Sequence, residues 1–286
     1  MPGLGAIVTA VVTPFDAAGR VDEDTFVALL AHLAASGSDG VVVAGTTGEG
    51  ATLDDEEHLG LIALAVQERP RADFSITAGV GSNDTRHAVE LTVGACERGA
   101  DALLSVNPYY NRPNRRGILA HYAEVTRAAD RPIVLYNIPQ RTGSDLSNEL
   151  LAELAQLDHI SAVKQANNTS LALVDGLELY AGNDDILART LDLGGAGGIL
   201  VASHVVGPRM RRMVDEPHNR SSIDQELQGV LAALGIAPAA TTAKAALSLL
   251  GHPVGAPRLP YVEVSEEELT IIRTALTDLD LIGAPA

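Results

Sequence analysis

The chain has 286 residues and a mass of 29.8 kDa, enough for one large α/β barrel or two ordinary domains. Its net charge of −17 disfavours nucleic-acid partners, because an acidic surface repels phosphate backbones. The single cysteine, Cys96, excludes an internal disulfide and a multi-cysteine metal site, and the glycine-rich uncharged run 193–208 is too short to span a membrane. We therefore expect a protein with no membrane segment and no signal peptide, located in the cytoplasm.

Short β-rich apolar runs alternate with longer amphipathic stretches along most of the chain. The predicted strands are residues 7–12, 40–43, 75–78, 102–106, 133–136, 160–163, 178–180 and 198–201. The predicted helices between and after them are residues 24–35, 54–69, 84–98, 116–128, 148–156, 171–175, 185–192 and 208–214. Most of the strands are almost continuously apolar, as is typical of parallel strands covered on both faces.

Eight strands alternating with eight helices predict a (β/α)8 TIM barrel, with a doubly wound open sheet as the alternative. From about residue 222 the pattern changes to three helices, 223–234, 239–250 and 265–279, separated by prolines. We interpret this part as a small helical appendage. The expected organisation is a barrel carrying the active site over residues 1–221 and a C-terminal helical extension over 222–286.

Polar, glycine-rich and aromatic segments follow the predicted strands, where the active sites of barrel enzymes are built. They are GTTGEG at 45–50, NPYYNRP at 107–113, YNIPQRTG at 136–143, VKQ at 163–165 and AGND at 181–184, and the eighth strand itself reads GILV at 198–201. Reactive side chains therefore gather at one end of the predicted barrel.

Lysine occurs only at Lys164 and Lys244, and arginine supplies the other 18 basic residues. A lysine kept in such a chain suggests a task that guanidinium cannot perform, such as nucleophilic attack by a neutral amine. Lys164 ends an apolar strand, where burial would lower the pKa of its amine; an ion pair at the barrel rim is the alternative. Lys244 lies in an alanine-rich helix and is expected to be a solvated charge.

Other side chains in these segments suit substrate binding and proton transfer. Tyr136 offers a phenol that can move protons, or is simply a core or rim residue. Thr46 and Thr47 lie in a glycine-flanked turn that suits a carboxylate or is merely a tight turn, and Arg141 suits a carboxylate or is a solvated surface charge. The Walker and dinucleotide motifs are absent, and the spacing of the eight histidines disfavours a metal site, so no cofactor and no metal are predicted.

These motifs, in this order, resemble the dihydrodipicolinate synthase family of pyruvate-dependent class I aldolases, which is related to N-acetylneuraminate lyase. The similarity covers nearly the whole chain, from the Val-Thr-Pro at 12–14 to the helical tail. The resemblance implies condensation of pyruvate with aspartate 4-semialdehyde to 4-hydroxy-tetrahydrodipicolinate, in diaminopimelate and lysine synthesis. Lys164 would form a Schiff base with pyruvate, and Tyr136, Thr46 and Tyr110 would be the proton relay, with Tyr110 supplied by a neighbouring subunit.

For substrate binding, the resemblance implies that Thr47 holds the pyruvate carboxylate and Arg141 the carboxylate of the semialdehyde. Gly182 and Ile199 would line the pocket through backbone contacts. Such a site needs at least a homodimer, and members of the family are usually homotetramers.

The chain departs from the family pattern at Gln165, 167–168 and Asn183, which leaves open another pyruvate-dependent aldolase acting on a sugar acid or other aldehyde. A non-catalytic barrel that binds a keto acid is a further alternative, of a different class. Lysine-inhibited members of the family have Ser, His and Glu at their effector site. In this chain the neighbouring positions are occupied by Gly50, Asp55 and His87. The hypothesis that follows is weak or absent feedback inhibition by lysine.

Overall fold

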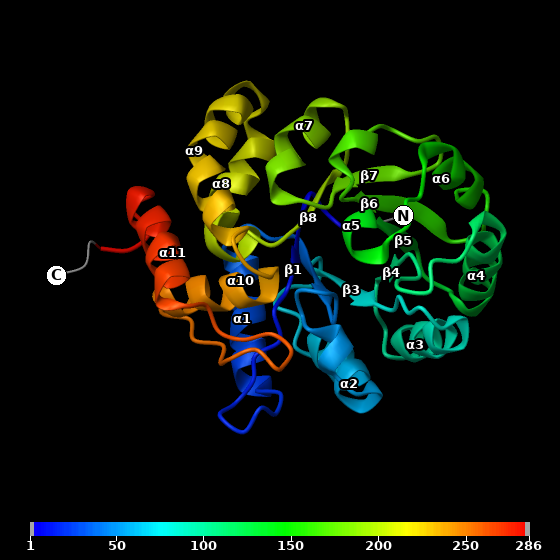
Figure 1. Ribbon diagram of the computed structural model, residues 1–286, viewed down its shortest axis with the longest axis horizontal. Coiled ribbons are helices and arrows are strands. Elements are labelled where there is room, and N and C mark those ends of the chain that lie inside the picture. Colours follow the sequence, from blue (N-terminus) through cyan, green and yellow to red (C-terminus); the bar gives the residue numbers. More distant parts are fainter. Residues whose placement is uncertain (1–2, 284–286) are drawn as a thin grey trace.

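The computed structural model describes residues 3–283 and contains a closed barrel of eight parallel strands. Each strand pairs with the next along the chain, and β8 pairs with β1 to close the ring. The strands are β1 Ile7–Ala10, β2 Gly40–Val43, β3 Ser75–Gly79, β4 Ala102–Val106, β5 Ile133–Asn137, β6 Ile160–Gln165, β7 Glu178–Ala181 and β8 Gly197–Leu200. The predicted barrel is thus confirmed, and Figure 1 shows helices surrounding it.

The apolar runs form strands because each has two buried faces to fill. In β2, Val41 and Val43 belong to the core between the barrel and its helices, whereas Val42 belongs to the core inside the barrel. Successive side chains of a strand point to opposite faces of the sheet. In a strand that is buried on both faces, the residues on each face must therefore be apolar, and apolar and polar residues do not alternate.

The helices that cover the barrel follow the strands in turn. Their bounds are α1 Glu23–Ala35, α2 Asp55–Gln67, α3 Thr85–Glu97, α4 Arg115–Ala128, α5 Pro139–Thr142, α6 Asn148–Leu154, α7 Leu187–Asp192 and α8 Ser203–Asp215. Short 3-10 turns lie at Gly50–Thr52, Asn168–Ser170, Asp184–Ile186 and Pro217–Asn219.

Two sequence expectations were wrong in this region. Residues 171–175 form no helix: an antiparallel bridge joins Val174 to Leu177 around Gly176, whose φ of +84° favours glycine. Leu177 N–H donates to the Val174 carbonyl at 3.0 Å, so the end of this segment closes a tight turn and does not continue as a helix. The helix expected at 208–214 begins earlier, at Ser203, and is kinked at Val206 because Pro208 lacks the N–H that would continue the hydrogen-bond ladder.

Three helices complete the chain: α9 Arg220–Leu234, α10 Ala239–Leu249 and α11 Glu266–Asp278. α9 packs on both α8 and α11, and α10 packs on α8, so the extension lies against one side of the barrel (Figure 1). No single helix within residues 3–283 is long and apolar enough to cross a membrane, although Pro217–Leu234 and α10 would pass as a bent pair by length and composition alone. The division into units 1–221 and 222–286 stays a prediction.

Candidate active site

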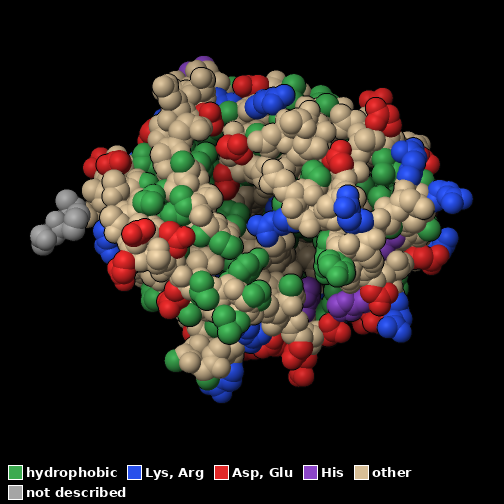
Figure 2. Space-filling model, in the orientation of Figure 1, with side chains coloured by type: hydrophobic (Ala, Val, Ile, Leu, Met, Phe, Trp, Pro, Cys, Tyr) green, Lys and Arg blue, Asp and Glu red, His purple; other side chains and the backbone are tan. Residues whose placement is uncertain are grey.

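A cavity of about 480 Å³ opens at the carboxyl ends of the strands. Its walls come from the strand ends, from the loops after β2, β5 and β7, and from α9 and the start of α10. Figure 2 shows a hollow near the middle of this face, with acidic and basic side chains at its rim. The predicted site residues that line the cavity are Thr46, Thr47, Tyr136, Arg141, Lys164 and Gly182.

Lys164 and Tyr136 meet inside the barrel because their strands pair in register. Tyr136 of β5 lies opposite Lys164 of β6, so both side chains point to the same face of the sheet. Lys164 is 5% exposed and Tyr136 7% exposed, and the Lys164 Nζ lies 4.4 Å from the centre of the Tyr136 ring. The amine is therefore held beside the tyrosine ring at the floor of the cavity, and neither side chain lies at the rim. Tyr136 also belongs to the core inside the barrel, which agrees with the core alternative for this residue.

Burial changes the proton affinity of both groups. It lowers the pKa of Lys164 from 10.5 to about 8, opposed by the negative charge of Asp184 and assisted by the positive charge of Arg141. Burial also raises the pKa of Tyr136 to about 12, so this phenol is neutral at physiological pH. A usable fraction of free amine thus lies next to a proton donor.

Asp184 is a cavity residue to which sequence reasoning gave no role. Its Oδ1 accepts hydrogen bonds from the backbone N–H groups of Val201 and Ala202, at 2.9 and 3.0 Å. Burial raises the pKa of its carboxyl, while those hydrogen bonds and the charge of Lys164 act in the opposite direction. Its place in the segment after β7 was the available signal, but nothing in the spacing indicated partners in the segment after β8.

The loop after β2 presents two hydroxyl groups to the cavity. Thr46 is exposed and Thr47 is 6% exposed. The turn is closed by backbone hydrogen bonds from Glu49 N to Thr46 O and from Gly50 N to Gly45 O, both at 3.1 Å. Two neighbouring residues with hydroxyl side chains therefore line the cavity, which suits recognition of a carboxylate.

Glycine and a short helix shape the opposite wall. Gly182 donates a backbone hydrogen bond to Gln165 O at 2.8 Å, and a Cβ at this position would lie 2.8 Å from backbone atoms of Gln165 and Ala166. Arg141 lies on α5, whose first turn starts at Pro139, and it forms no salt bridge within residues 3–283. Its guanidinium can therefore donate hydrogen bonds to the carboxylate of a ligand.

Two predicted site residues do not line this cavity. Tyr110 is 89% exposed, with a left-handed φ of +68° after β4, and it faces neither this cavity nor a neighbouring one. Ile199 is fully buried in the core inside the barrel. The roles assigned to these two residues stay predictions.

Lys244 is not the solvated charge that its alanine-rich helix suggested. It is 2% exposed, and its Nζ lies 2.7 Å from Oε1 of Glu49, which is also 2% exposed. The expectation was wrong because α10 packs against the barrel, so the side chain enters the interior. The partner lies in the loop after β2, and spacing along the sequence could not indicate it.

A second cavity, of about 580 Å³, adjoins the first and shares Thr46, Tyr136 and Arg141 with it. On its wall, His87 Nε2 lies 2.9 Å from Asp55 Oδ1. In the part of the chain that the structure describes, no three His, Cys, Asp or Glu side chains are grouped as metal ligands would be. The arrangement in the first cavity fits carbonyl chemistry through a lysine amine.

Comparison with known proteins supports the family resemblance that the sequence motifs indicated. The model of the dihydrodipicolinate synthetase family matches residues 3–279. The 4-hydroxy-tetrahydrodipicolinate synthase of Thermosynechococcus vestitus is 39% identical, over 99% of each chain.

Two solved structures are similar over nearly the whole fold. The dihydrodipicolinate synthase of Cyanidioschyzon merolae, solved with lysine bound, has a TM-score of 0.93 at 37% identity and covers 98% of this chain and 99% of its own. The chloride-inhibited enzyme of Acinetobacter baumannii, solved with pyruvate, has a TM-score of 0.93 at 30% identity and covers 98% of this chain and 100% of its own. With a family match of this length and a buried lysine at the mouth of the barrel, the chain belongs to the dihydrodipicolinate synthetase family.

Proposed function

We propose that this protein condenses pyruvate with L-aspartate 4-semialdehyde to give 4-hydroxy-tetrahydrodipicolinate, in diaminopimelate and lysine synthesis. The observation that carries the proposal is the buried Lys164 amine, whose pKa is lowered to about 8, beside Tyr136 in a cavity with hydroxyl and guanidinium groups. The pyruvate recorded in the Acinetobacter baumannii relative supports the identity of the first substrate.

The first half of the reaction uses the amine and the phenol. Neutral Lys164 attacks the ketone carbon of pyruvate, and the hydroxyl of the carbinolamine leaves as water after taking a proton from Tyr136. Thr46 and Tyr110 complete the proton relay, and Thr47 holds the pyruvate carboxylate. Loss of a methyl proton from the resulting imine gives an enamine.

In the second half, the enamine carbon attacks the aldehyde of the semialdehyde, whose carboxylate lies against Arg141. The amino group of that substrate then attacks the imine carbon, which closes the ring. The Lys164 nitrogen takes up a proton and its bond to this carbon breaks, which leaves the C=N bond in the ring and frees the amine. Because Tyr110 points away from its own cavity, the relay requires a second subunit, and we propose a homodimer or homotetramer in the cytoplasm.

Reduction with borohydride in the presence of pyruvate tests the first step. A reduced pyruvyl adduct should appear on the peptide containing Lys164, and only when pyruvate is present. Lys164→Arg is the matched control, since it keeps a cation but cannot form the imine. An unmodified Lys164 in the wild-type protein would refute the Schiff-base proposal and favour a barrel that merely binds a keto acid.

The second substrate is tested by product analysis with the same preparation. Aspartate semialdehyde and pyruvate should yield the cyclic product, whereas N-acetylneuraminate should not be cleaved. Trapping at Lys164 without turnover of the semialdehyde would instead indicate an aldolase for another aldehyde.

A further inference from the structure

A buried ion pair lies directly behind the loop that carries Thr46 and Thr47. Glu49 closes this loop, and its Oε1 lies 2.7 Å from Lys244 Nζ. Lys244 also donates to the carbonyl of Ala256, at 3.3 Å. The pair therefore joins the loop after β2 to α10 and to the segment that follows α10.

Glu49 is held in a backbone conformation that few side chains adopt. Its φ of +57° lies in the left-handed region, where a residue other than glycine needs support from its surroundings. The neighbouring Gly48 carbonyl accepts a hydrogen bond from the Thr13 hydroxyl at 2.6 Å. The turn that presents Thr46 and Thr47 is thus fixed at its far end by the side chain of Glu49 and by Thr13.

The other oxygen of the Glu49 carboxylate is also held by the C-terminal segment. Oε2 accepts a hydrogen bond from the backbone N–H of Arg258 at 2.8 Å. The Arg258 guanidinium donates to both oxygens of Glu57 on α2, at 2.6 and 2.7 Å, and so anchors this segment beside the loop. Both cations, Lys244 Nζ and the Arg258 guanidinium carbon, lie 4.3 Å from the centre of the Phe15 ring.

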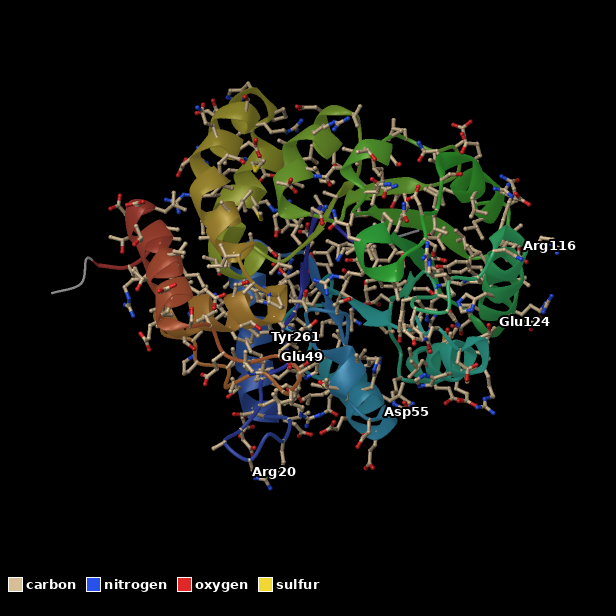
Figure 3. The ribbon with its side chains drawn as sticks, viewed as in Figure 1. Arg20, Glu49, Asp55, Arg116, Glu124 and Tyr261 are labelled. Atoms are coloured by element: carbon tan, nitrogen blue, oxygen red, sulfur yellow. The ribbon has the colours of Figure 1, made fainter. Side chains whose placement is uncertain are left out.

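Figure 3 shows Glu49 and Tyr261 where the C-terminal loop passes the end of α2, and both residues line the second cavity. The start of α10 at Ala239 lines the first cavity, which contains Lys164. A single C-terminal helix therefore contacts the substrate cavity at one end and holds Glu49 through its middle.

A buried pair of this kind is an inefficient way to gain stability. Two charges lose their hydration, and well-packed uncharged side chains often replace such a pair without loss of stability. What the pair provides here is position, because the Lys244 cation lies 2.7 Å from one oxygen of the carboxylate and the backbone N–H of Arg258 donates to the other.

We propose that Glu49 and Lys244 are positioning residues, which fix the Thr46–Thr47 loop at the distance that pyruvate binding requires and make the C-terminal extension part of the active site. This inference rests on the proposed function, because Thr47 is taken to hold the pyruvate carboxylate. Neither residue of the pair lines the cavity that contains Lys164.

The test compares the double variant Glu49→Gln/Lys244→Met with wild type. Because both charges are removed together, this variant should fold and melt close to wild type. The pyruvate concentration that half-saturates borohydride trapping should rise about tenfold or more, as expected when a loop loses its position by a fraction of an ångström. The pH dependence of trapping should not change, because Lys164 keeps its surroundings.

The matched control is Arg212→Met/Glu216→Gln, which likewise replaces a cation by methionine and Glu by Gln, in a solvent-accessible pair at the C-terminal end of α8, and should leave half-saturation unchanged. If the double variant does not fold, Glu49→Asp keeps the charge on a shorter side chain and should show the same rise. Half-saturation equal to wild type in a folded variant would overturn the inference. Failure of wild type itself to be trapped would instead overturn the proposed function, so the two results are separable.

Discussion

Replacing the lysine of the cavity should make the protein more stable at neutral pH. The pKa of Lys164 falls from 10.5 to about 8 because folding buries its amine. At about 1.4 kcal/mol per pKa unit, this difference between the unfolded and folded pKa values corresponds to about 3 kcal/mol. It lowers the free energy of unfolding at every pH at which the buried amine is protonated. Lys164→Met removes this cost and keeps a side chain of similar length.

The sign follows from proton binding in the two states. Between pH 8 and 10.5 the unfolded chain carries a proton on this amine and the folded protein does not, so the stability of wild type rises with pH. Lys164→Met should therefore exceed wild type in stability by about 3 kcal/mol at pH 7 and by about 1 kcal/mol at pH 9.5, with the difference vanishing above pH 10.5.

Equilibrium unfolding in urea at equal subunit concentration measures this difference at pH 7, 8.5 and 9.5. Lys164→Arg serves as the control, because guanidinium remains charged when buried and should be less stable than the methionine variant throughout this range. A methionine variant that is less stable than wild type at pH 7, or a difference that does not change with pH, would refute the reasoning.

Three further outcomes follow. Asp184→Asn should lower the pKa of Lys164 and move the rise of the trapping rate to lower pH, while Arg141→Met should move it to higher pH; shifts of the same sign would contradict the electrostatic account. Tyr110→Phe subunits should be poorly active alone but regain part of their activity when assembled with Lys164→Arg subunits, because one mixed site then holds both groups; no gain in size-selected mixed oligomers would contradict a shared relay. Millimolar lysine should leave the initial rate almost unchanged, because residues at the expected effector site differ from those of inhibited members; strong cooperative inhibition would show this expectation to be wrong.

The barrel could be predicted because its strands have a simple physical requirement. Every strand end lies within two residues of its predicted position, since a strand buried on both faces must be apolar and ends where polar loop residues begin. The clustering of Thr46, Tyr136, Arg141 and Lys164 followed from one rule, that parallel strands present their carboxyl ends together. The helix predicted at residues 171–175 was wrong, because a five-residue segment with leucine and valine is compatible with both a helix and a β-bridge.

Contacts between distant segments could not be predicted in this way. The surroundings of Lys244 depend on how α10 packs on the barrel, and its partner Glu49 lies in a loop almost two hundred residues earlier. Asp184 was similarly visible as a polar residue after a strand, yet its partners are backbone groups of the segment after β8. Such pairings are properties of the packed structure and leave no periodic signal.

The two lysines also show why burial alone does not make a reactive amine. Burial lowers the pKa of both, and both lie a little over 4 Å from the centre of an aromatic ring. Glu49 lies 2.7 Å from the Lys244 amine and raises its proton affinity, so its proton and its position are both fixed. Lys164 forms no salt bridge within residues 3–283, faces a cavity that can admit a ketone, and has a neutral phenol beside it. The scarcity of lysine in this chain fits both sites, because a guanidinium can neither form the imine nor fit as a compact point charge between Phe15 and a single carboxylate oxygen.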